Sequence, residues 1–479
     1  MSATQTLAAT HRPAADLQTA AAAWFDAGHF RAQLAERVQV PTTSEEGSAD
    51  ALDTYLAQHM APALQAMGFQ CERLENPLPG QPPFLLAERI ESLELPTLLS
   101  YGHGDVVRGQ DASWRIGLGP WVLRVEGDRW YGRGTADNKG QHSINMAALA
   151  QVIAARQGRL GYNVKLLLEM GEEVGSPGLR ELCTAQAGRL RADLFLASDG
   201  PRLHAESPTL FLGSRGIANF TLRLRCRERA YHSGNWGGVL TNPAVVVAHA
   251  ITSLMGRHGA MRVDALQPPP IDAQVRAALA GIAIGTGADD PACDPRWGAA
   301  ELSDAERLHA WNTLEVLAMG SGSPDRPVGA IPPEAVAHCQ MRFVPGTPWQ
   351  QFGPILRAHL DAHGFEEVEV EVTAATPATR LSLKNDWVPW TLERMAQATG
   401  KTPTLLPNLA GSLPNDAFAE ILGLPTLWLP HSYPACAQHA PNEHLLGSVA
   451  REALLMMTHL FHALGDDGAP WQPAPAAAS

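Results

Sequence analysis

The chain has 479 residues, 45% of them hydrophobic and 18% charged, which excludes an intrinsically disordered protein and suggests more than one domain. Its 36 basic and 49 acidic side chains give a formal net charge of −13, which disfavours nucleic acid and anionic membranes as partners. No stretch approaches the ~20 apolar residues of a membrane span, and six widely spaced cysteines without a Cys-x-x-Cys pair predict a cytoplasmic protein.

The first part of the chain alternates helical segments with short apolar runs. Amphipathic stretches at 19–30 and 49–67 predict helices near the start. Apolar runs then end at Gly or Asp, with helix-like segments between them; the runs are 96–101, 163–170 and 192–198, and the helices 140–156 and 177–189. Strands that alternate with helices are typical of a mostly parallel sheet flanked by helices.

From about Gly213 the pattern changes to alternating apolar and polar residues, as in half-exposed antiparallel strands. These predicted strands are 217–225, 335–343 and 367–372, accompanied by helices at 244–257 and 349–363. The earlier pattern returns with a helix at 387–399 and a strand at 425–430. We therefore predict an α/β domain formed by 1–212 and 377–479, interrupted by an inserted α+β domain at 213–376. The Pro- and Gly-rich stretch 264–325 lies within this insertion, without assigned structure.

Polar side chains follow three of the predicted parallel strands. His103 and Asp105 come after the first apolar run, Glu172 and Glu173 after the second, and Asp199 after the third. Each pattern alone is commonly a solvated turn. Functional groups gather at the carboxyl ends of parallel strands, however, so together they predict one cleft.

Two further polar residues, Asp137 and His439, each lie between a short strand and a helix. A set of histidines and carboxylates without a thiolate suits divalent zinc, manganese or cobalt. Crowded carboxylates repel one another, and two divalent ions would remove that penalty. Asp105 is spaced to accept the second imidazole N–H of His103. Of the adjacent Glu172 and Glu173, we expect one to bind metal and the other to take a proton from water.

Seven motifs between about Leu98 and Glu443 resemble, in order, those of the M20 metallopeptidases. They are Gly102-His-Gly-Asp-Val-Val107, Tyr131-Gly-Arg-Gly-Thr-Ala-Asp-Asn-Lys-Gly140, Glu172-Glu-Val-Gly-Ser-Pro177, Ser198-Asp-Gly-Pro201, Tyr231-His-Ser-Gly-Asn-Trp-Gly-Gly238, Met341-Arg-Phe-Val-Pro345 and His439-Ala-Pro-Asn-Glu443. The family includes glutamate carboxypeptidase, succinyl-diaminopimelate desuccinylase, acetylornithine deacetylase and the carnosine dipeptidases. The stretch 308–319, leading into Ile331-Pro, is most similar to the carnosine dipeptidase branch.

The resemblance implies a pair of divalent metal ions, expected as zinc with cobalt or manganese as alternatives. The implied ligands are Asp137 as the bridge, His103 and Asp199 on one ion, and Glu173 and His439 on the other. A cis peptide bond is implied after the bridging aspartate. The domain formed by 1–212 and 377–479 is then the catalytic domain, and 213–376 is a lid and dimerisation domain.

Further roles are implied for residues around these ligands. Glu172 is the implied general base, and His232 the donor to the oxyanion, reaching the active site of the partner subunit in a homodimer. Arg342 is expected to bind a substrate carboxylate, because its fork of donors suits bidentate contact. Asn242 is expected to line the same pocket.

One motif departs from the carnosine dipeptidase pattern, which has Arg-x-Gly-Gly-Ser-Ile-Pro. This chain has Asn408-Leu-Ala-Gly-Ser-Leu-Pro414, so asparagine replaces arginine and Ala410 replaces a glycine. The backbone amides of Gly411 and Ser412 remain candidate anion donors. The lost cation puts carnosinase-like recognition of a dipeptide in doubt.

The implied reaction is hydrolysis of an amide bond in a small carboxylate-bearing substrate by metal-activated water. A dipeptide or an N-acyl amino acid is the preferred substrate. An N-carbamoyl compound or another non-peptide amide is the alternative, since it also presents an amide carbonyl beside an anion. A non-catalytic M20-like binding protein is disfavoured by the full set of ligands and base.

Overall fold

The computed structural model describes residues 14–45, 49–287 and 290–471. Contacts divide the chain into two compact units. Unit 1 comprises Met1–Phe211, Lys384–Leu405 and Ala417–Ser479, and unit 2 comprises Leu212–Leu383 and Leu406–Asp416. The short segment Leu406–Asp416 thus returns to unit 2 after the chain has re-entered unit 1.

An eight-stranded sheet forms the centre of unit 1. In spatial order its strands are β1 (Gln70–Leu74), β2 (Phe84–Arg89), β6 (Asn163–Glu169), β3 (Thr97–His103), β7 (Leu194–Ala197), β16 (Thr426–Trp428), β8 (Thr209–Phe211) and β15 (Thr404–Leu406). The four central strands, β6, β3, β7 and β16, are parallel, whereas β1, β2 and β8 pair antiparallel towards the edges. Every residue of β6 and β7 is buried, which explains the apolar runs Leu166–Leu168 and Leu194–Ala197 within them.

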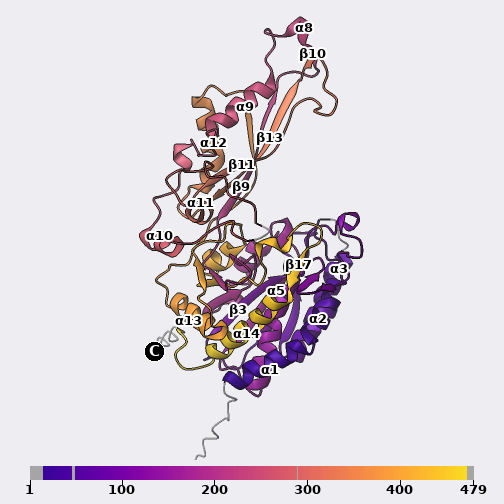
Figure 1. Cartoon of the computed structure of the whole chain (residues 1–479), viewed down its shortest axis with the longest axis vertical. Helices are drawn as coiled ribbons and strands as arrows, with labels where there is room; N and C mark the ends of the chain where they lie inside the picture. The colour runs from indigo at the N-terminus through magenta and orange to yellow at the C-terminus, as the bar shows by residue number, and fades with distance from the viewer. Residues whose placement is uncertain (1–13, 46–48, 288–289, 472–479) are drawn as a thin grey trace, which may run out of the picture. The chain divides into compact units, whose positions relative to one another are not determined.

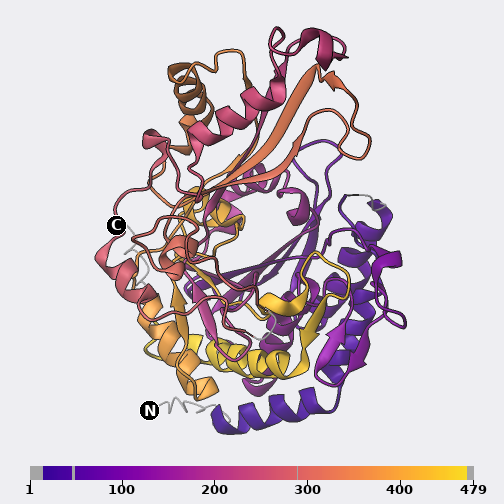
Figure 2. The ribbon, with the colours of Figure 1, turned by 45° about the horizontal axis from the view of Figure 1, so that its top comes forward.

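Helices from both ends of the chain cover this sheet (Figure 1). The longest are α1 (Ala14–Asp26), α2 (His29–Val38), α5 (Lys139–Ala155), α13 (Trp387–Thr399) and α14 (Gly447–Leu464). Helix α14 contacts α1, α5 and α13, so the two ends of the chain lie side by side in unit 1 (Figure 2). The stretch 19–30 does not form one helix, because Gly28 has a φ of 87° and separates α1 from α2.

Shorter elements complete unit 1. The predicted helix at 49–67 is α3 (Ala49–Thr54), a π-helical turn (Tyr55–Met60) and α4 (Ala61–Ala66), and α6 (Leu179–Ala185) and α7 (Ala187–Leu190) follow β6. A second sheet has the order β17 (His444–Leu446), β5 (Arg129–Tyr131) and β4 (Arg124–Glu126). This small sheet joins segments that are about 300 residues apart in the sequence.

Unit 2 is built on an antiparallel sheet with the order β11 (Thr313–Gly320), β13 (Glu334–Phe343), β9 (Gly216–Arg225) and β14 (Glu369–Thr376). Alternate residues of β9 and β13 form one core with α9 (Pro243–Leu254) and α12 (Phe352–Ala362). The insertion contributes α10 (Ala273–Leu279) and α11 (Asp304–His309). Strands β10 (Tyr231–His232) and β12 (Ala330–Ile331) pair with each other, and α8 (Ser233–Trp236) follows directly after β10.

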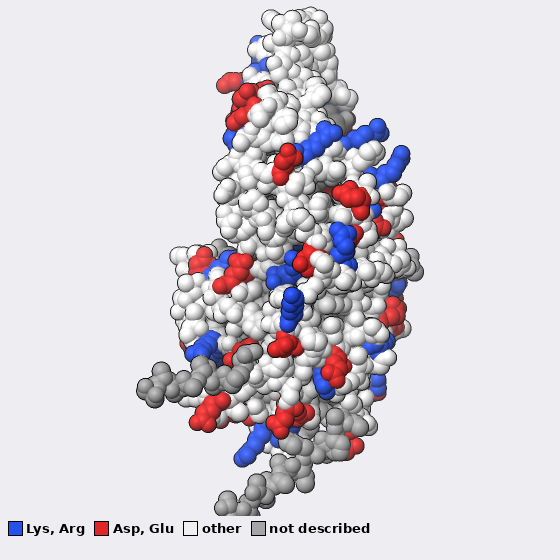
Figure 3. All heavy atoms as spheres, turned by 90° about the vertical axis from the view of Figure 1, so that its left-hand side faces the viewer, with Lys and Arg blue, Asp and Glu red and all other residues white. Residues whose placement is uncertain are grey.

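Within the described ranges, no helix is long and apolar enough to cross a bilayer. On the face drawn in Figure 3, the basic and acidic side chains of the described residues are interspersed rather than gathered into a basic stripe. That distribution lacks the clustered positive charge that follows a phosphate backbone.

Candidate metal centre

Four of the predicted polar side chains lie at the ends of three neighbouring parallel strands. His103 is the last residue of β3, and Asp199 follows the end of β7 by two residues. Glu172 and Glu173 begin a single 3₁₀ turn after β6. Because β6, β3 and β7 are parallel and adjacent, these side chains meet at one edge of the sheet.

The other two polar residues reach the same place from the small sheet of unit 1. Asp137 lies in the loop between β5 and α5, and His439 lies in the loop before β17. Strands β5 and β17 pair with Tyr131 opposite His444, which brings the two loops together. The peptide bond between Asp137 and Asn138 is cis, as the resemblance implied.

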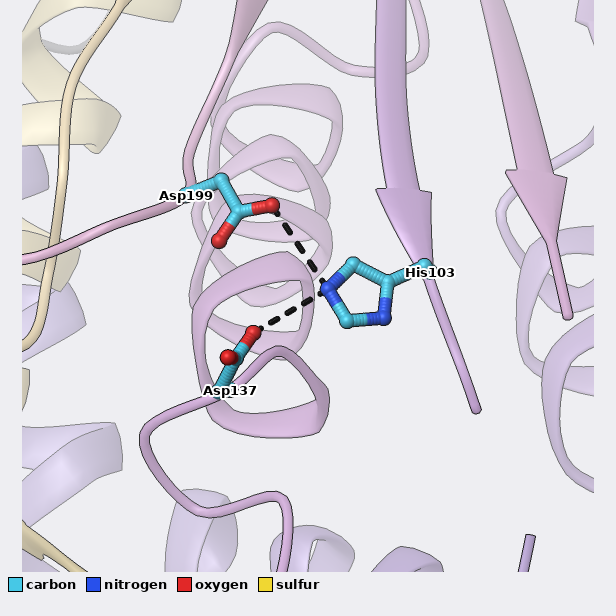
Figure 4. A group of neighbouring side chains, drawn as sticks. All are labelled: His103, Asp137 and Asp199. Carbon is cyan, nitrogen blue, oxygen red and sulfur yellow. Dashed lines mark hydrogen bonds and ion pairs between the residues drawn. The ribbon is translucent and has the colours of Figure 1, made fainter. Parts of the chain in front are cut away.

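These side chains form two groups, each with donor atoms within 4.8 Å of one another, and Asp137 belongs to both. In the first group, His103 Nε2 lies 3.1 Å from Asp137 Oδ1 and 3.5 Å from Asp199 Oδ2. Figure 4 shows the imidazole directed between these two carboxylates. In the second group, His439 Nε2 lies 3.0 Å from both Asp137 Oδ2 and Glu173 Oε2. The two oxygens of Asp137 therefore face different histidines.

The electrostatics of the two groups favour a bound cation. Burial opposes protonation of His103, but its contacts with Asp105, Asp137 and Asp199 outweigh burial and raise its pKa well above the usual value. Contacts with Asp137 and Glu173 raise the pKa of His439 to about 11. The carboxylates thus stabilise positive charge on both histidines. A divalent ion offers more positive charge, so the nitrogen and oxygen donors fit a metal pair.

Asp105 connects the first group to the paired glutamates. Its carboxylate lies 3.3 Å from His103 Nδ1, while the same nitrogen lies 3.1 Å from the Asp105 backbone oxygen. The two carboxylate oxygens accept the backbone N–H groups of Glu172 and Glu173, each at 3.1 Å. Asp105 thus positions the turn that carries both glutamates as well as the histidine.

Glu172 lies beside the two groups without belonging to either. Burial raises the pKa of its carboxyl well above the usual value; the charge of His103 opposes this shift, and those of Asp199 and Glu173 add to it. A carboxyl group with a raised pKa is suited to accepting and returning a proton near neutral pH. The geometry therefore distinguishes Glu172 from Glu173, which contacts His439 directly.

Glu443 and Arg133 are buried site residues that the sequence analysis did not single out. Glu443 accepts the backbone N–H groups of Gly134, Ala136 and Asp137 at 3.0, 2.9 and 3.1 Å, and Arg133 Nη1 donates to it at 2.8 Å. Glu443 therefore fixes the loop that presents Asp137. Both residues lie within the motifs that resemble those of the M20 metallopeptidases. The signal that singles them out is a charged residue close to small residues in such a motif.

Replacing Glu443 by glutamine is expected to destabilise the metal-free protein by about 3 kcal/mol, because the buried Arg133 loses its counter-charge. Chemical denaturation of the metal-stripped protein measures this loss. The exposed pair of Glu126 with Arg115 provides the control, since Glu126→Gln should cost no more than about 1 kcal/mol. Equal effects of the two substitutions would contradict the proposed role of Glu443.

The predicted oxyanion donor, His232, and the predicted substrate-binding residues belong to unit 2. His232 is exposed on β10, and the Asn242 side chain accepts the Ala244 N–H as the N-cap of α9. Arg342, on β13, donates to Ser412 Oγ at 2.7 Å and to Gln340 Oε1 at 3.0 Å. Gly411 precedes Ser412 in the loop that returns to unit 2. Because the metal centre belongs to unit 1, the roles of these residues towards it stay predictions.

Asn408, the residue that departs from the carnosine dipeptidase pattern described above, is a buried structural residue. Its Nδ2 donates to the backbone oxygens of Ser214 and Thr379, and its Oδ1 accepts from Arg380 at 3.2 Å. Its backbone oxygen lies 3.0 Å from His309 Nδ1. The asparagine amide thus stabilises unit 2, and the neighbouring guanidinium belongs to Arg380.

His309 gives unit 2 a stability that depends on pH. Burial lowers its pKa from 6.5 to about 4, and its Nε2 has no hydrogen-bond partner among the described residues. At a pH between these two values, His309 binds a proton in the unfolded chain but not in the folded chain. Stability is therefore expected to fall by about 3 kcal/mol as the pH drops from above 6.5 to 4.

The substitution His309→Asn tests this prediction, because asparagine retains a donor for the Asn408 oxygen and cannot titrate. Urea unfolding of both proteins at pH 4 and pH 7.5 gives the change in unfolding free energy. The difference in unfolding free energy between pH 7.5 and pH 4 should be about 3 kcal/mol smaller for the variant than for the natural protein. The same pH dependence in both proteins would contradict the assignment.

Comparisons with known proteins agree with this fold and site. The sequence profile described as peptidase family M20/M25/M40 matches residues 99–464. A Beta-Ala-His dipeptidase of Mus musculus is 36% identical over 181 residues, covering 37% of this chain and 36% of the mouse protein. The chain thus aligns with little more than a third of that relative's length.

Solved structures match over nearly the whole chain. Human carnosine dipeptidase 1 has a TM-score of 0.77 and 21% identity, covering 94% of this chain and 99% of that structure. The di-peptidase Dug1p of Saccharomyces cerevisiae has a TM-score of 0.79 and 20% identity, with the same coverage. At these identities the structures establish the fold. The family match spans most of the chain, so the protein belongs to the peptidase family M20/M25/M40.

Proposed function

We propose that this protein is a metal-dependent hydrolase that cleaves the amide bond of a small carboxylate-bearing substrate, with a dipeptide as the preferred class. The observation that carries the proposal is the pair of donor groups that share Asp137. The family match and the dipeptidases among the relatives support the choice of reaction. An N-acyl amino acid remains within the proposed class.

The proposed ligands are His103, Asp137 and Asp199 for one ion and Asp137, Glu173 and His439 for the other. We propose zinc as the native metal, with cobalt or manganese as alternatives, since all three accept nitrogen and oxygen donors. When bound, two divalent ions supply Lewis-acid activation of water and of the substrate carbonyl. Asp137 faces both histidines, which supports its role as the shared ligand.

The residues around the ligands carry the proton transfers. Glu172 takes a proton from the attacking water and returns it to the leaving amine nitrogen. Asp105 holds Glu172 in place through the backbone N–H of that residue. His232 is proposed to donate a hydrogen bond to the oxyanion of the tetrahedral intermediate, and Arg342 to bind the substrate carboxylate.

A substrate panel tests this function. Dipeptides, N-acyl amino acids and N-carbamoyl amino acids are incubated with the zinc-loaded protein, with and without a chelator. We expect dipeptide hydrolysis that stops with chelator and returns with added zinc. Turnover of N-carbamoyl compounds alone would favour the alternative substrate class. Metal binding without any turnover would favour a non-catalytic binding protein.

We also propose a homodimer through unit 2 in the cytoplasm, where the free cysteines would stay reduced. His232 supports the dimer, because an exposed histidine on β10 is free to reach a partner subunit. Light scattering together with an activity assay tests this arrangement. Full activity of a monomer in solution would contradict it.

A further inference from the structure

Unit 2 contains a cavity of about 480 Å³, and the proposed mechanism assigns a role to only one residue of its lining, Arg342. It lies between β11 and β13 on one side and the stretch around α11 on the other. Small-molecule sites commonly have volumes of about 300–1,000 Å³, so it has room for a whole amino-acid residue. Its lining combines guanidinium groups with aromatic and apolar side chains, including Arg215, Arg342, Trp297 and Trp311.

Two arginines in the lining carry charges that no acid neutralises directly. Arg215 is 5% exposed and donates to the backbone oxygens of Ala410 and Trp311 and to Thr313 Oγ1. Arg342 donates to the neutral side chains of Gln340 and Ser412. Within the described residues, neither guanidinium forms an ion pair. Burial, followed by repulsion from Arg342, lowers the pKa of Arg215 to about 9.

The lining has as many acidic side chains as arginines, but none of these acids forms an ion pair with Arg215 or Arg342 among the described residues. Asp304 pairs with Arg307 at 2.8 Å, and Asp294 is exposed. Glu315 is also exposed; its charge attracts Arg215 from beyond ion-pair distance. A carboxylate entering between Arg215 and Arg342 would relieve their repulsion and satisfy free N–H donors.

The remaining lining is apolar and aromatic. Trp297, Trp311, Met261, Ile284 and Leu308 contribute to it, and Trp297 is 44% exposed. Trp297 packs on the backbone of Gly259, where an added Cβ would lie 2.6 Å from the indole ring. Gly259 also has a φ of +80°, so this close approach favours glycine. The backbone therefore positions a flat aromatic surface that is half open to a ligand.

We propose that this cavity binds the carboxyl-terminal residue of the substrate and selects an aromatic or large apolar side chain there. The carboxylate contacts Arg215 and Arg342, and the side chain packs against Trp297 and Trp311. This inference rests on the proposed function and narrows its substrate class to dipeptides or N-acyl amino acids ending in such a residue.

Binding of 3-phenylpropionate to the metal-stripped protein tests the cavity without catalysis. Calorimetry is expected to give at least tenfold tighter binding than for acetate, which lacks the ring, or 3-phenylpropionamide, which lacks the charge. Trp297→Ala should weaken binding at least tenfold. Trp236→Ala, which removes a tryptophan of the same unit with 43% exposure, should leave it unchanged. Equal affinity in the two variants would overturn the proposal.

Hydrolysis by the zinc-loaded protein links the cavity to the reaction. We expect kcat/KM for Ala-Phe to exceed that for Ala-Gly at least tenfold. Trp297→Ala should remove this preference by raising KM for Ala-Phe, whereas Trp236→Ala should retain it. 3-Phenylpropionate should inhibit competitively. Hydrolysis without the preference, or binding without competition, would overturn the cavity assignment alone. Binding of 3-phenylpropionate without hydrolysis of any amide would overturn the proposed function and this assignment together.

Discussion

Replacing Glu172 by glutamine is expected to lower kcat by about 10²–10⁴-fold while both metal ions remain bound. Glu172 lies outside the two donor groups, so the substitution removes a proton acceptor and no ligand. Glutamine has the same shape and cannot take a proton from water. The backbone N–H of residue 172 still donates to Asp105, so the turn is expected to keep its position.

Steady-state hydrolysis of a dipeptide, together with metal analysis of the same sample, measures both effects. Glu181→Gln is the control, because Glu181 is exposed on α6 in the same unit. Near-normal turnover in Glu172→Gln would remove the assigned general base. Loss of metal instead would make Glu172 a ligand rather than a base.

Replacing Asp137 by asparagine is expected to abolish tight binding of at least one metal ion and nearly all activity. Asp137 is the residue that both donor groups share, and its two oxygens face different histidines. An amide retains one oxygen and removes the negative charge between the two ions. Removing a residue that merely supports a ligand costs about 10–100-fold in metal affinity, so losing the shared ligand should cost more.

Dialysis against zinc followed by elemental analysis gives the number of ions per chain. We expect two for the natural protein and no more than one for Asp137→Asn. Asp128→Asn is the control, because Asp128 lies in the same unit and contacts Ser448 rather than the donor groups. Two tightly bound ions in Asp137→Asn would contradict a bridging role.

The central fold could be predicted because its signals are local. Continuous apolar runs correspond to the buried strands β3, β6 and β7, and alternating residues correspond to β9 and β13. The sequence also pointed to polar residues at the strand ends, which is where His103 and Asp199 lie. Sheet topology then brings together residues that the sequence keeps far apart.

The remaining features depend on contacts that no local pattern records. Glu443 supports the Asp137 loop from 306 positions away, through hydrogen bonds to backbone groups. The return of Leu406–Asp416 to unit 2 follows from the buried contacts of Asn408. The cavity of unit 2 is lined partly by the Pro- and Gly-rich insertion, whose irregular sequence carries no periodic signal. Such features arise from tertiary packing.

The most direct test is anomalous X-ray diffraction from crystals of the zinc-loaded protein at the zinc absorption edge. We expect two anomalous peaks, one on either side of the Asp137 carboxylate. One peak should be contacted by His103 and Asp199, and the other by Glu173 and His439. Peaks bound to other residues, or none at these five side chains under saturating zinc, would contradict this assignment.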